Sequence, residues 1–180
     1  MWYYMINMKN DFTLKRLNVE MGQSEYEMFQ DIPAREVGSR NLCFGVPFEN
    51  FRAYIRSQLA REFNRISEYD TPTIIFVGYA KNKPVGIVGI RTKINNHWKN
   101  FGGNIFYVIR KSERNKGYGT TMLKMAVKEC EKLGIKTVYA QCNVNNIASY
   151  KIIEKNNFEL IKVDKSRHYK KDLNKTSDKN

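Results

Sequence analysis

The stretch from Arg114 to Thr120 has the composition of a loop that binds a phosphate group. Two glycines, Gly117 and Gly119, are separated by one residue, and an apolar run, Ile105–Ile109, precedes the loop. Glycine permits a tight turn in which several backbone N–H groups approach a ligand. An amphipathic segment follows, and a helix starting there would present unpaired N–H donors and the positive end of its dipole. The residues expected to hold a pyrophosphate are therefore Arg114, Asn115, Lys116, Gly117, Tyr118, Gly119 and Thr120.

Two better-known phosphate loops do not match this stretch. A P-loop requires Gly-x-x-x-x-Gly-Lys-Ser/Thr, and this spacing does not occur in the sequence. The dinucleotide-binding fingerprint requires a third glycine where this chain has Met122, followed by an acidic residue that binds a ribose. The pattern that remains is Arg-x-x-Gly-x-Gly between a strand and a helix. A glycine turn with solvated basic residues would have the same pattern, so the rest of the chain must distinguish the two.

The composition restricts the class of protein. A chain of 180 residues suits one domain with a substantial core. No apolar run approaches the roughly 20 residues of a membrane helix, and the N-terminal segment lacks the basic start of a secretory signal. Cys43, Cys130 and Cys142 form no Cys-x-x-Cys pair, and His97 and His168 lie far apart. We therefore expect a cytoplasmic protein with neither a disulfide framework nor a metal site.

The charge of the chain is strongly positive. The formal net charge is +13, and the lysines and arginines are spread over the whole length. Such a charge is compatible with nucleic-acid binding, although no basic cluster supports it. A basic surface would equally attract a small polyanionic ligand by electrostatic steering.

The hydrophobic pattern predicts strands and helices in an irregular order. Strands are expected at 12–17, 73–79, 85–91, 105–109, 137–142 and 158–163, with a last one beginning at 167–169; helices are expected at 24–30, 48–66, 118–133 and 147–156. Phe51, Ile55, Leu59 and Phe63 recur every four residues, which predicts one continuous amphipathic helix over 48–66. This order favours an α+β protein with a mixed sheet covered by helices. We expect residues 1–174 to form one domain, with residues 1–10 as a loose extension and residues 175–180 as a disordered tail.

A second motif follows the loop after one helix and one strand. Asn146-Ile147-Ala148-Ser149 is followed by Ile152-Ile153-Glu154-Lys155-Asn156-Asn157-Phe158. This stretch resembles the fourth-helix motif of the GNAT (GCN5-related N-acetyltransferase) superfamily, Asn-x-x-Ala/Ser-x-x-x-Tyr-Glu-Lys-x-Gly-Phe, and the loop resembles the superfamily's coenzyme A loop. The stretch from Gly102 to Tyr118 is similar to that of a bacterial subgroup. The resemblance implies a central, mostly antiparallel sheet of about seven strands, about four flanking helices and a V-shaped acetyl-CoA cleft.

The resemblance also implies an activity and a site. The chain would be an N-acetyltransferase in which a primary amine of an unidentified acceptor directly attacks acetyl-CoA in a ternary complex. Backbone groups of Val108, Ile109 and Arg110 would pair with the pantetheine arm as an added strand, and an N–H near Ile109 would hold the thioester oxygen. The candidate polar contacts to the same arm are Asn143, Asn146 and Ser149.

The chain departs from the superfamily at both usual proton-transfer positions. Ile153 replaces the tyrosine with which many relatives protonate the leaving thiolate, and Asn104 replaces a glutamate. Tyr150 lies one turn before Ile153 and is a candidate acid, although packing on the sheet is its simpler interpretation. The candidate bases are Glu113, Tyr107 and His97.

The acceptor is not identified by the sequence. Its pocket is expected to include the 24–30 segment, the loop after it, Arg91 and the 93–100 connection. The acidic end of the long helix, with Glu62, Glu68, Tyr69 and Asp70, could attract a cationic amine. Two other functions stay open, namely an acyl-CoA-binding module without catalysis and a nucleic-acid-binding protein. The sequence implies no membrane partner and leaves a homodimer possible.

Overall fold

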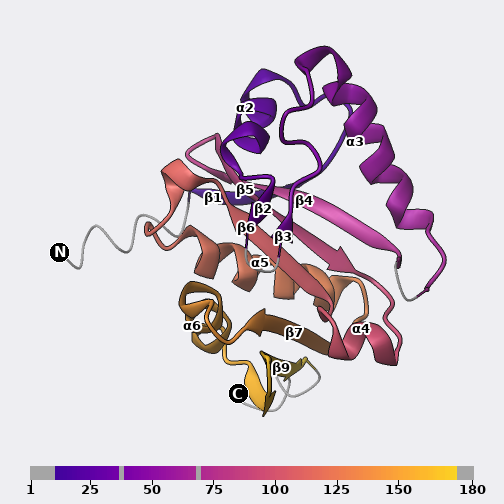
Figure 1. The fold of residues 1–180 in the computed structure, drawn as a ribbon, viewed down its shortest axis with the longest axis vertical. Coiled ribbons are helices and arrows are strands. Elements are labelled where there is room, and N and C mark those ends of the chain that lie inside the picture. The colour runs from indigo at the N-terminus through magenta and orange to yellow at the C-terminus, as the bar shows by residue number, and fades with distance from the viewer. Residues whose placement is uncertain (1–10, 37–38, 68–69, 174–180) are drawn as a thin grey trace.

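A computed structural model of the chain describes residues 11–36, 39–67 and 70–173 (Figure 1). The predicted N-terminal extension and C-terminal tail, and the candidate residues Glu68 and Tyr69, lie outside these ranges. The strands form a four-stranded sheet of order β1-β4-β5-β6, a three-stranded sheet of order β7-β9-β8, and the small hairpin β2-β3. All pairings are antiparallel. The predicted α+β fold class is confirmed.

The strands of the two sheets match the expected segments closely. Their bounds are β1 Phe12–Arg16, β4 Thr73–Ala80, β5 Lys83–Arg91, β6 Ile105–Ile109, β7 Thr137–Asn143, β8 Glu159–Val163 and β9 Ser166–Asp172, and the hairpin joins β2 Arg35–Glu36 to β3 Ser39–Arg40. The helices are α2 Gln23–Asp31, α3 Phe51–Ala60, α4 Asn96–Asn100, α5 Tyr118–Lys132 and α6 Ile147–Lys155, and single 3-10 turns lie at Phe48–Asn50, Arg61–Phe63 and Lys111–Glu113.

Helices cover both faces of the four-stranded sheet. On one face, α2 and α3 bury Phe29 and Ile55 against Val77 of β4. On the other face, α5 buries Leu123 in a core that includes Val88 of β5. The strands β4 and β5 are apolar between their ends because neither has a solvated face, as the sequence predicts.

The expectation of one continuous helix over 48–66 is wrong. The α-helix ends at Ala60, and the chain tightens into the 3-10 turn Arg61–Phe63. A 3-10 turn has three residues per turn rather than 3.6, so a side chain in it leaves the apolar stripe of the preceding helix. Phe63 is consequently 86% exposed, whereas Phe51 and Ile55 on the same predicted stripe are buried.

Two segments expected as irregular connections contain short elements. The hairpin β2-β3 lies in the loop after α2, and α4 lies in the connection between β5 and β6. The side chain of Asn95 caps α4 by accepting a hydrogen bond from the backbone N–H of Trp98 at 3.0 Å. Such short elements escape periodicity because they are shorter than the pattern that would reveal them.

The two sheets are joined at one place only among the described strands, in the segment just before β6. Gly103 forms an isolated bridge with Ala140 of β7, and its φ of +65° and its close approach to Tyr139 admit no side chain. The buried Asn104 then connects both sheets, since its Nδ2 donates to the Arg91 carbonyl (3.0 Å) and its Oδ1 accepts from the Tyr139 N–H (2.9 Å). The sequence analysis noted Asn104 only as the replacement of a glutamate that could act as a base. The structure shows why a carboxamide suits the position, since both its donor and its acceptor form hydrogen bonds.

Candidate functional site

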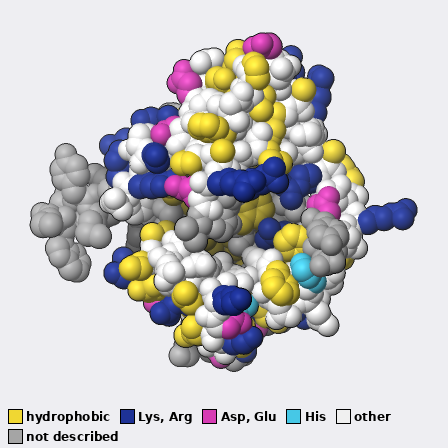
Figure 2. All heavy atoms as spheres, in the orientation of Figure 1, with side chains coloured by type: hydrophobic (Ala, Val, Ile, Leu, Met, Phe, Trp, Pro, Cys, Tyr) yellow, Lys and Arg dark blue, Asp and Glu magenta, His cyan; other side chains and the backbone are white. Residues whose placement is uncertain are grey.

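A cleft of about 580 Å³ opens between β6, α5, β7 and α6. Figure 2 shows it as a hollow near the centre of the displayed face, with Lys and Arg side chains along its upper rim. It is lined by both predicted motifs, including Ile109, Arg114, Asn115, Gly117, Tyr118, Gly119 and Thr120 from the loop side and Asn143, Asn146 and Ser149 from the other side. The fold therefore brings the two motifs to one cavity, as expected.

The loop before α5 has the backbone geometry of an anion site. Asn115 and Gly117 both have positive φ, 62° and 81°, and α5 begins directly after them at Tyr118. No side chain caps the first turn of α5, so its N–H donors remain available at the positive end of the helix dipole. Gly117 has open space where a side chain would stand. A phosphate can therefore approach the backbone directly.

Gly119 has a different role from Gly117. It is buried, and a Cβ placed on it would lie 2.7 Å from Cδ1 of Ile152. The second glycine of the motif thus allows α5 and α6 to pack closely, while the first provides the left-handed conformation that the turn requires.

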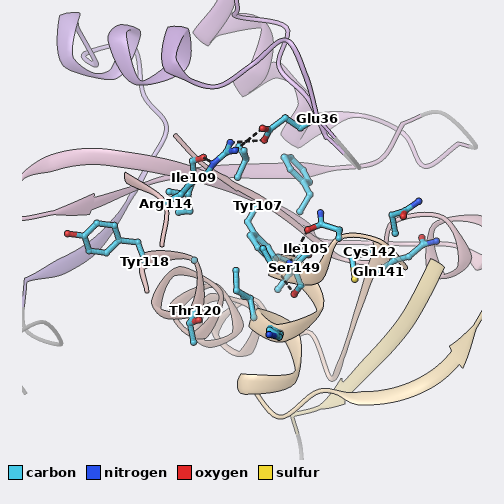
Figure 3. A pocket seen from close by; sticks show the side chains of 18 of the residues that line it. Glu36, Ile105, Tyr107, Ile109, Arg114, Tyr118, Thr120, Gln141, Cys142 and Ser149 are labelled. Carbon is cyan, nitrogen blue, oxygen red and sulfur yellow. Dashed lines mark hydrogen bonds and ion pairs between the residues drawn. The ribbon is translucent and has the colours of Figure 1, made fainter. Parts of the chain in front are cut away.

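The basic side chains of the loop are already engaged. Arg114 forms a two-fold ion pair with Glu36 at 2.8 and 2.7 Å and also donates to the Ile109 carbonyl (Figure 3). Lys116 and Lys83 both bind the buried Glu113 carboxylate. These hydrogen bonds, that from Lys116 first and that from Lys83 second, hold the pKa of Glu113 below its usual range. The backbone rather than free lysine charge is therefore the main anion-binding feature of the loop.

Two lysines that the sequence analysis did not select also line the cleft. Lys151 and Lys155 lie on α6, four residues apart and so on the same side of the helix. Their spacing on a predicted helix that faces the loop was the signal that could have identified them. They add positive charge opposite the loop.

The register of β6 decides which backbone groups face the cleft. The Arg110 N–H donates to Val85 of β5, and the Arg91 N–H donates to Asn104, so the residues that bond to β5 alternate along β6. Val108 pairs with Ile87 of β5, and Arg110 directs its N–H to β5 while its carbonyl accepts from the Glu113 N–H; Tyr107 and Ile109 direct their backbone groups to the open edge. The expectation that Val108 and Arg110 pair with a ligand through their backbone is therefore wrong, and the geometry retains Ile109.

A pair of hydroxyl groups lies deeper in the cleft. The Tyr107 hydroxyl is 3.0 Å from Oγ of Ser149 and 3.2 Å from its carbonyl oxygen, and both side chains line the cavity (Figure 3). Burial raises the pKa of the Tyr107 phenol, so the group is protonated at neutral pH. Asn146 caps α6 by accepting from the Ser149 N–H at 3.1 Å, which fixes the start of the helix that carries Ser149.

This geometry is that of a known family. Residues 27–159, about three quarters of the chain, match the family model described as an acetyltransferase (GNAT) domain. The chain belongs to the GNAT family. No curated protein matches this GNAT chain by sequence.

Solved structures of GNAT proteins share its fold. RimL, a ribosomal L7/L12 α-N-protein acetyltransferase in complex with coenzyme A, superposes with a TM-score of 0.69 and 14% identity, covering 92% of this chain and 96% of its own. The microcin C7 self-immunity acetyltransferase MccE, in complex with acetyl-CoA and AMP, gives 0.66 and 17%, with 91% and 93% covered. The Campylobacter jejuni N-acetyltransferase PseH, in complex with acetyl-CoA, gives 0.57 and 15%, with 90% and 99% covered.

The cleft of this GNAT domain fits acetyl-CoA as cosubstrate. It combines the uncapped first turn of α5, the open edge of β6 and cationic side chains on α6, which suit a diphosphate and an extended amide-containing arm. Among the described residues, no group of three or more acidic, histidine or cysteine side chains could hold a metal ion. Within the same ranges, no helix has both the length and the apolarity to cross a bilayer.

Several candidate proton-transfer residues lie elsewhere. Tyr150 is not among the described residues that line the cleft. Its ring packs on the core, and the Arg167 guanidinium carbon lies 4.3 Å from the centre of the ring. Ile153 is a buried core residue. His97 is not among the residues that line the cleft, although its ring stacks on Phe101, which does line it. The simpler interpretation of Tyr150, an aromatic side chain packed on the core, agrees with these contacts.

Proposed function

We propose that this GNAT domain transfers the acetyl group of acetyl-CoA to a primary amine by direct attack in a ternary complex. The observation that carries the proposal is that two sets of backbone groups outside the helix and sheet pairing, the first turn of α5 and the open edge of β6, line the same cleft. The first set suits phosphates, and the second suits the amides of an extended arm. Their order along the cleft is the order of these groups in acetyl-CoA.

In this proposal the peptide groups of the loop and of β6 position the cosubstrate. The N–H groups of residues 117–120 bind the diphosphate, and Lys151 and Lys155 add charge from α6. The Ile109 N–H, which faces the open edge, donates to the thioester oxygen as negative charge develops on it. Binding both substrates in one cleft also brings the amine close to the carbonyl carbon, which contributes part of the rate.

The Tyr107–Ser149 pair supplies the proton that the leaving group needs. The amine attacks in its neutral form, having lost one proton to water; the new N–C bond forms and the C–S bond breaks. The amine nitrogen then releases a second proton to water. The thiolate takes a proton from the Ser149 hydroxyl, which is hydrogen-bonded to Tyr107, and water restores the proton of the pair. Glu113 is less suited to act as base because its carboxylate is held by two lysines.

The test is a comparison of two glycine variants. Gly117→Val and Gly134→Val both place a side chain at a positive φ, 81° and 73°, with no neighbouring atom in contact. Both should therefore carry a similar conformational cost, of about 1–3 kcal/mol. Only Gly117 lies in the cleft, so only Gly117→Val should weaken coenzyme A binding, by about 100-fold, as measured by calorimetry on the folded variant.

Thiol release completes the experiment. Release of coenzyme A thiol from acetyl-CoA that depends on an added amine supports the proposal. Binding of coenzyme A without amine-dependent release in a broad amine library would show a binding module instead of an enzyme. Equal coenzyme A affinity of the two glycine variants would remove the loop from the site. A thermal shift produced by DNA alone and abolished by salt would favour nucleic-acid binding.

A further inference from the structure

A second cavity lies next to the acetyl-CoA cleft. It measures about 320 Å³, within the usual range for a small-molecule site. Arg91, Phe106, Tyr107 and Val108 line both cavities, so the two meet along β6. A ligand in this second cavity would therefore reach the position where the acetyl group is expected.

Three arginines line this second cavity, and among the described residues no carboxylate lines it. Arg40 ends β3, Arg61 follows α3, and Arg91 ends β5. The acidic residues that could neutralise them are engaged elsewhere: Glu36, on the neighbouring cleft wall, binds Arg114, and Glu62 binds Arg16. Glu62 was expected to attract a cationic amine, but it pairs with Arg16 and does not line this cavity.

The contacts of Arg91 are with aromatic rings and backbone carbonyl groups rather than with a carboxylate. Its guanidinium lies over the rings of Trp98 (4.4 Å) and Phe106 (4.9 Å), and Nη1 donates to the Gly103 carbonyl at 3.0 Å. Its Nε is buried and has no hydrogen-bond acceptor among the described residues. Burial, and secondarily the charge of Arg61, lowers the pKa of Arg91 to about 10. A buried cation beside a like charge is costly unless an anion binds to it.

We propose that the acceptor is a small primary amine that carries an oxyanion, a carboxylate or a phosphate, and that Arg91, Arg61 and Arg40 bind this oxyanion. The inference rests on the proposed acetyltransferase function and specifies its substrate class. A planar guanidinium matches both oxyanions through paired hydrogen bonds, and a like-charged cluster gains most from such a ligand. The volume of about 320 Å³ favours a small molecule over a protein segment. The amine of the bound acceptor would lie at the Tyr107 end of the cavity, where the acetyl group is transferred.

The test uses amines in matched forms with coenzyme A or acetyl-CoA present. L-Serine and O-phosphoethanolamine, which carry an oxyanion, are each compared with ethanolamine, which does not. L-Tyrosine, which carries a carboxylate, is compared with tyramine, which does not. We expect at least one oxyanion form to bind about tenfold more tightly than the matched amine without the oxyanion by calorimetry, and to be acetylated with a correspondingly higher kcat/KM. The carboxylate and phosphate arms distinguish the two oxyanions.

Two arginine variants on the same segment locate the effect. Arg61→Gln should abolish the preference for the oxyanion form, whereas Arg56→Gln, an exposed residue of α3 outside the cavity lining, should retain it. Coenzyme A binding is measured in both variants as a check on folding and on the cleft.

Three outcomes overturn the inference. If the amines with and without the oxyanion bind equally, or if none of them binds, recognition of an oxyanion is excluded. Loss of the preference in both arginine variants makes it a general charge effect. Acetylation of an acidic peptide in preference to every small oxyanion amine identifies a protein acceptor. In each case intact coenzyme A binding and thiol release leave the acetyltransferase proposal standing, so the two failures are distinguishable.

Discussion

The two cavities that meet at β6 differ in what they are built from. The acetyl-CoA cleft relies on backbone groups: the uncapped first turn of α5 and the open edge of β6. The second cavity relies on arginine side chains from three separate segments, at Arg40, Arg61 and Arg91. The first set is fixed by local geometry, and the second is fixed only by the packing of α3 and β3 on the sheet.

This difference corresponds to what each cavity must recognise. A cosubstrate with a constant diphosphate and amide arm can be held by peptide groups, which every sequence provides once the turn and the strand edge are formed. An acceptor differs between enzymes, and side chains can be exchanged without altering the backbone that supports them. Three variants test whether the two cavities can be altered separately.

The largest effect is expected at Asn104, which connects the two sheets. Asn104→Leu keeps the branched shape of the side chain but leaves the Arg91 carbonyl and the Tyr139 N–H without their side-chain partner. Unsatisfied buried polar groups cost about 1–3 kcal/mol each, so the free energy of unfolding should fall by about 2–6 kcal/mol. Urea denaturation measures it, with the exposed Asn100→Leu as the control.

Binding in both cavities should weaken together with the stability in this variant. If Asn104→Leu weakened coenzyme A binding while leaving the second cavity and the stability intact, the side chain would not join the two sheets, and the comparison would need another junction.

A smaller effect, confined to catalysis, is expected where the two cavities meet. Tyr107→Phe removes the hydroxyl that contacts Ser149. Affinity for coenzyme A should change by less than about twofold, while the acetyl-transfer rate at saturating substrates should fall by about 10- to 100-fold. This is less than the roughly 10²–10⁴-fold contribution of a general acid because Ser149 keeps its own hydroxyl. Single-turnover measurements separate transfer from binding.

The matched control for that variant is Tyr150→Phe, since Tyr150 packs on the core outside the cleft lining. Its transfer rate should equal that of the unaltered protein. A slow Tyr150→Phe beside a normal Tyr107→Phe would instead assign the proton donor to Tyr150.

The smallest effect is expected at the loop, and it depends on pH. The pKa of Glu113 is below its usual value of 4.5 because Lys116 and Lys83 bind its charged form. A depressed pKa means that the carboxylate stabilises the folded state fully above the usual pKa and loses this contribution as pH falls through the folded value. Glu113→Gln should therefore lower the free energy of unfolding by about 1–2 kcal/mol at pH 7, and this difference should disappear in acid.

Unfolding is followed from pH 7 to pH 3, with Glu129→Gln, whose partner Lys132 is exposed, as the control. The control should change by less than about 0.5 kcal/mol. A Glu113→Gln effect that persisted unchanged in acid would show that packing, and not the lysine pairs, is what the side chain provides.

Local features of the sequence predicted much of the cosubstrate side. The strand at 105–109 and the glycine turn depend on neighbouring residues, and the structure has them where the pattern placed them. Phe63 was misplaced because a tighter turn interrupts the helical period there. Val108 and Arg110 were misassigned because the direction of their peptide groups is set by pairing with β5.

By itself, therefore, the sequence determined the α+β class, the order of elements and the loop that faces a phosphate, because turns, caps and hydrophobic periods act within a few residues. Only the tertiary structure decided which edge of β6 is open, that Asn104 joins the sheets, and that Arg40, Arg61 and Arg91 share a cavity without a counter-charge. These features depend on strand register and on contacts between residues far apart in the chain, for which spacing in the sequence carries no signal.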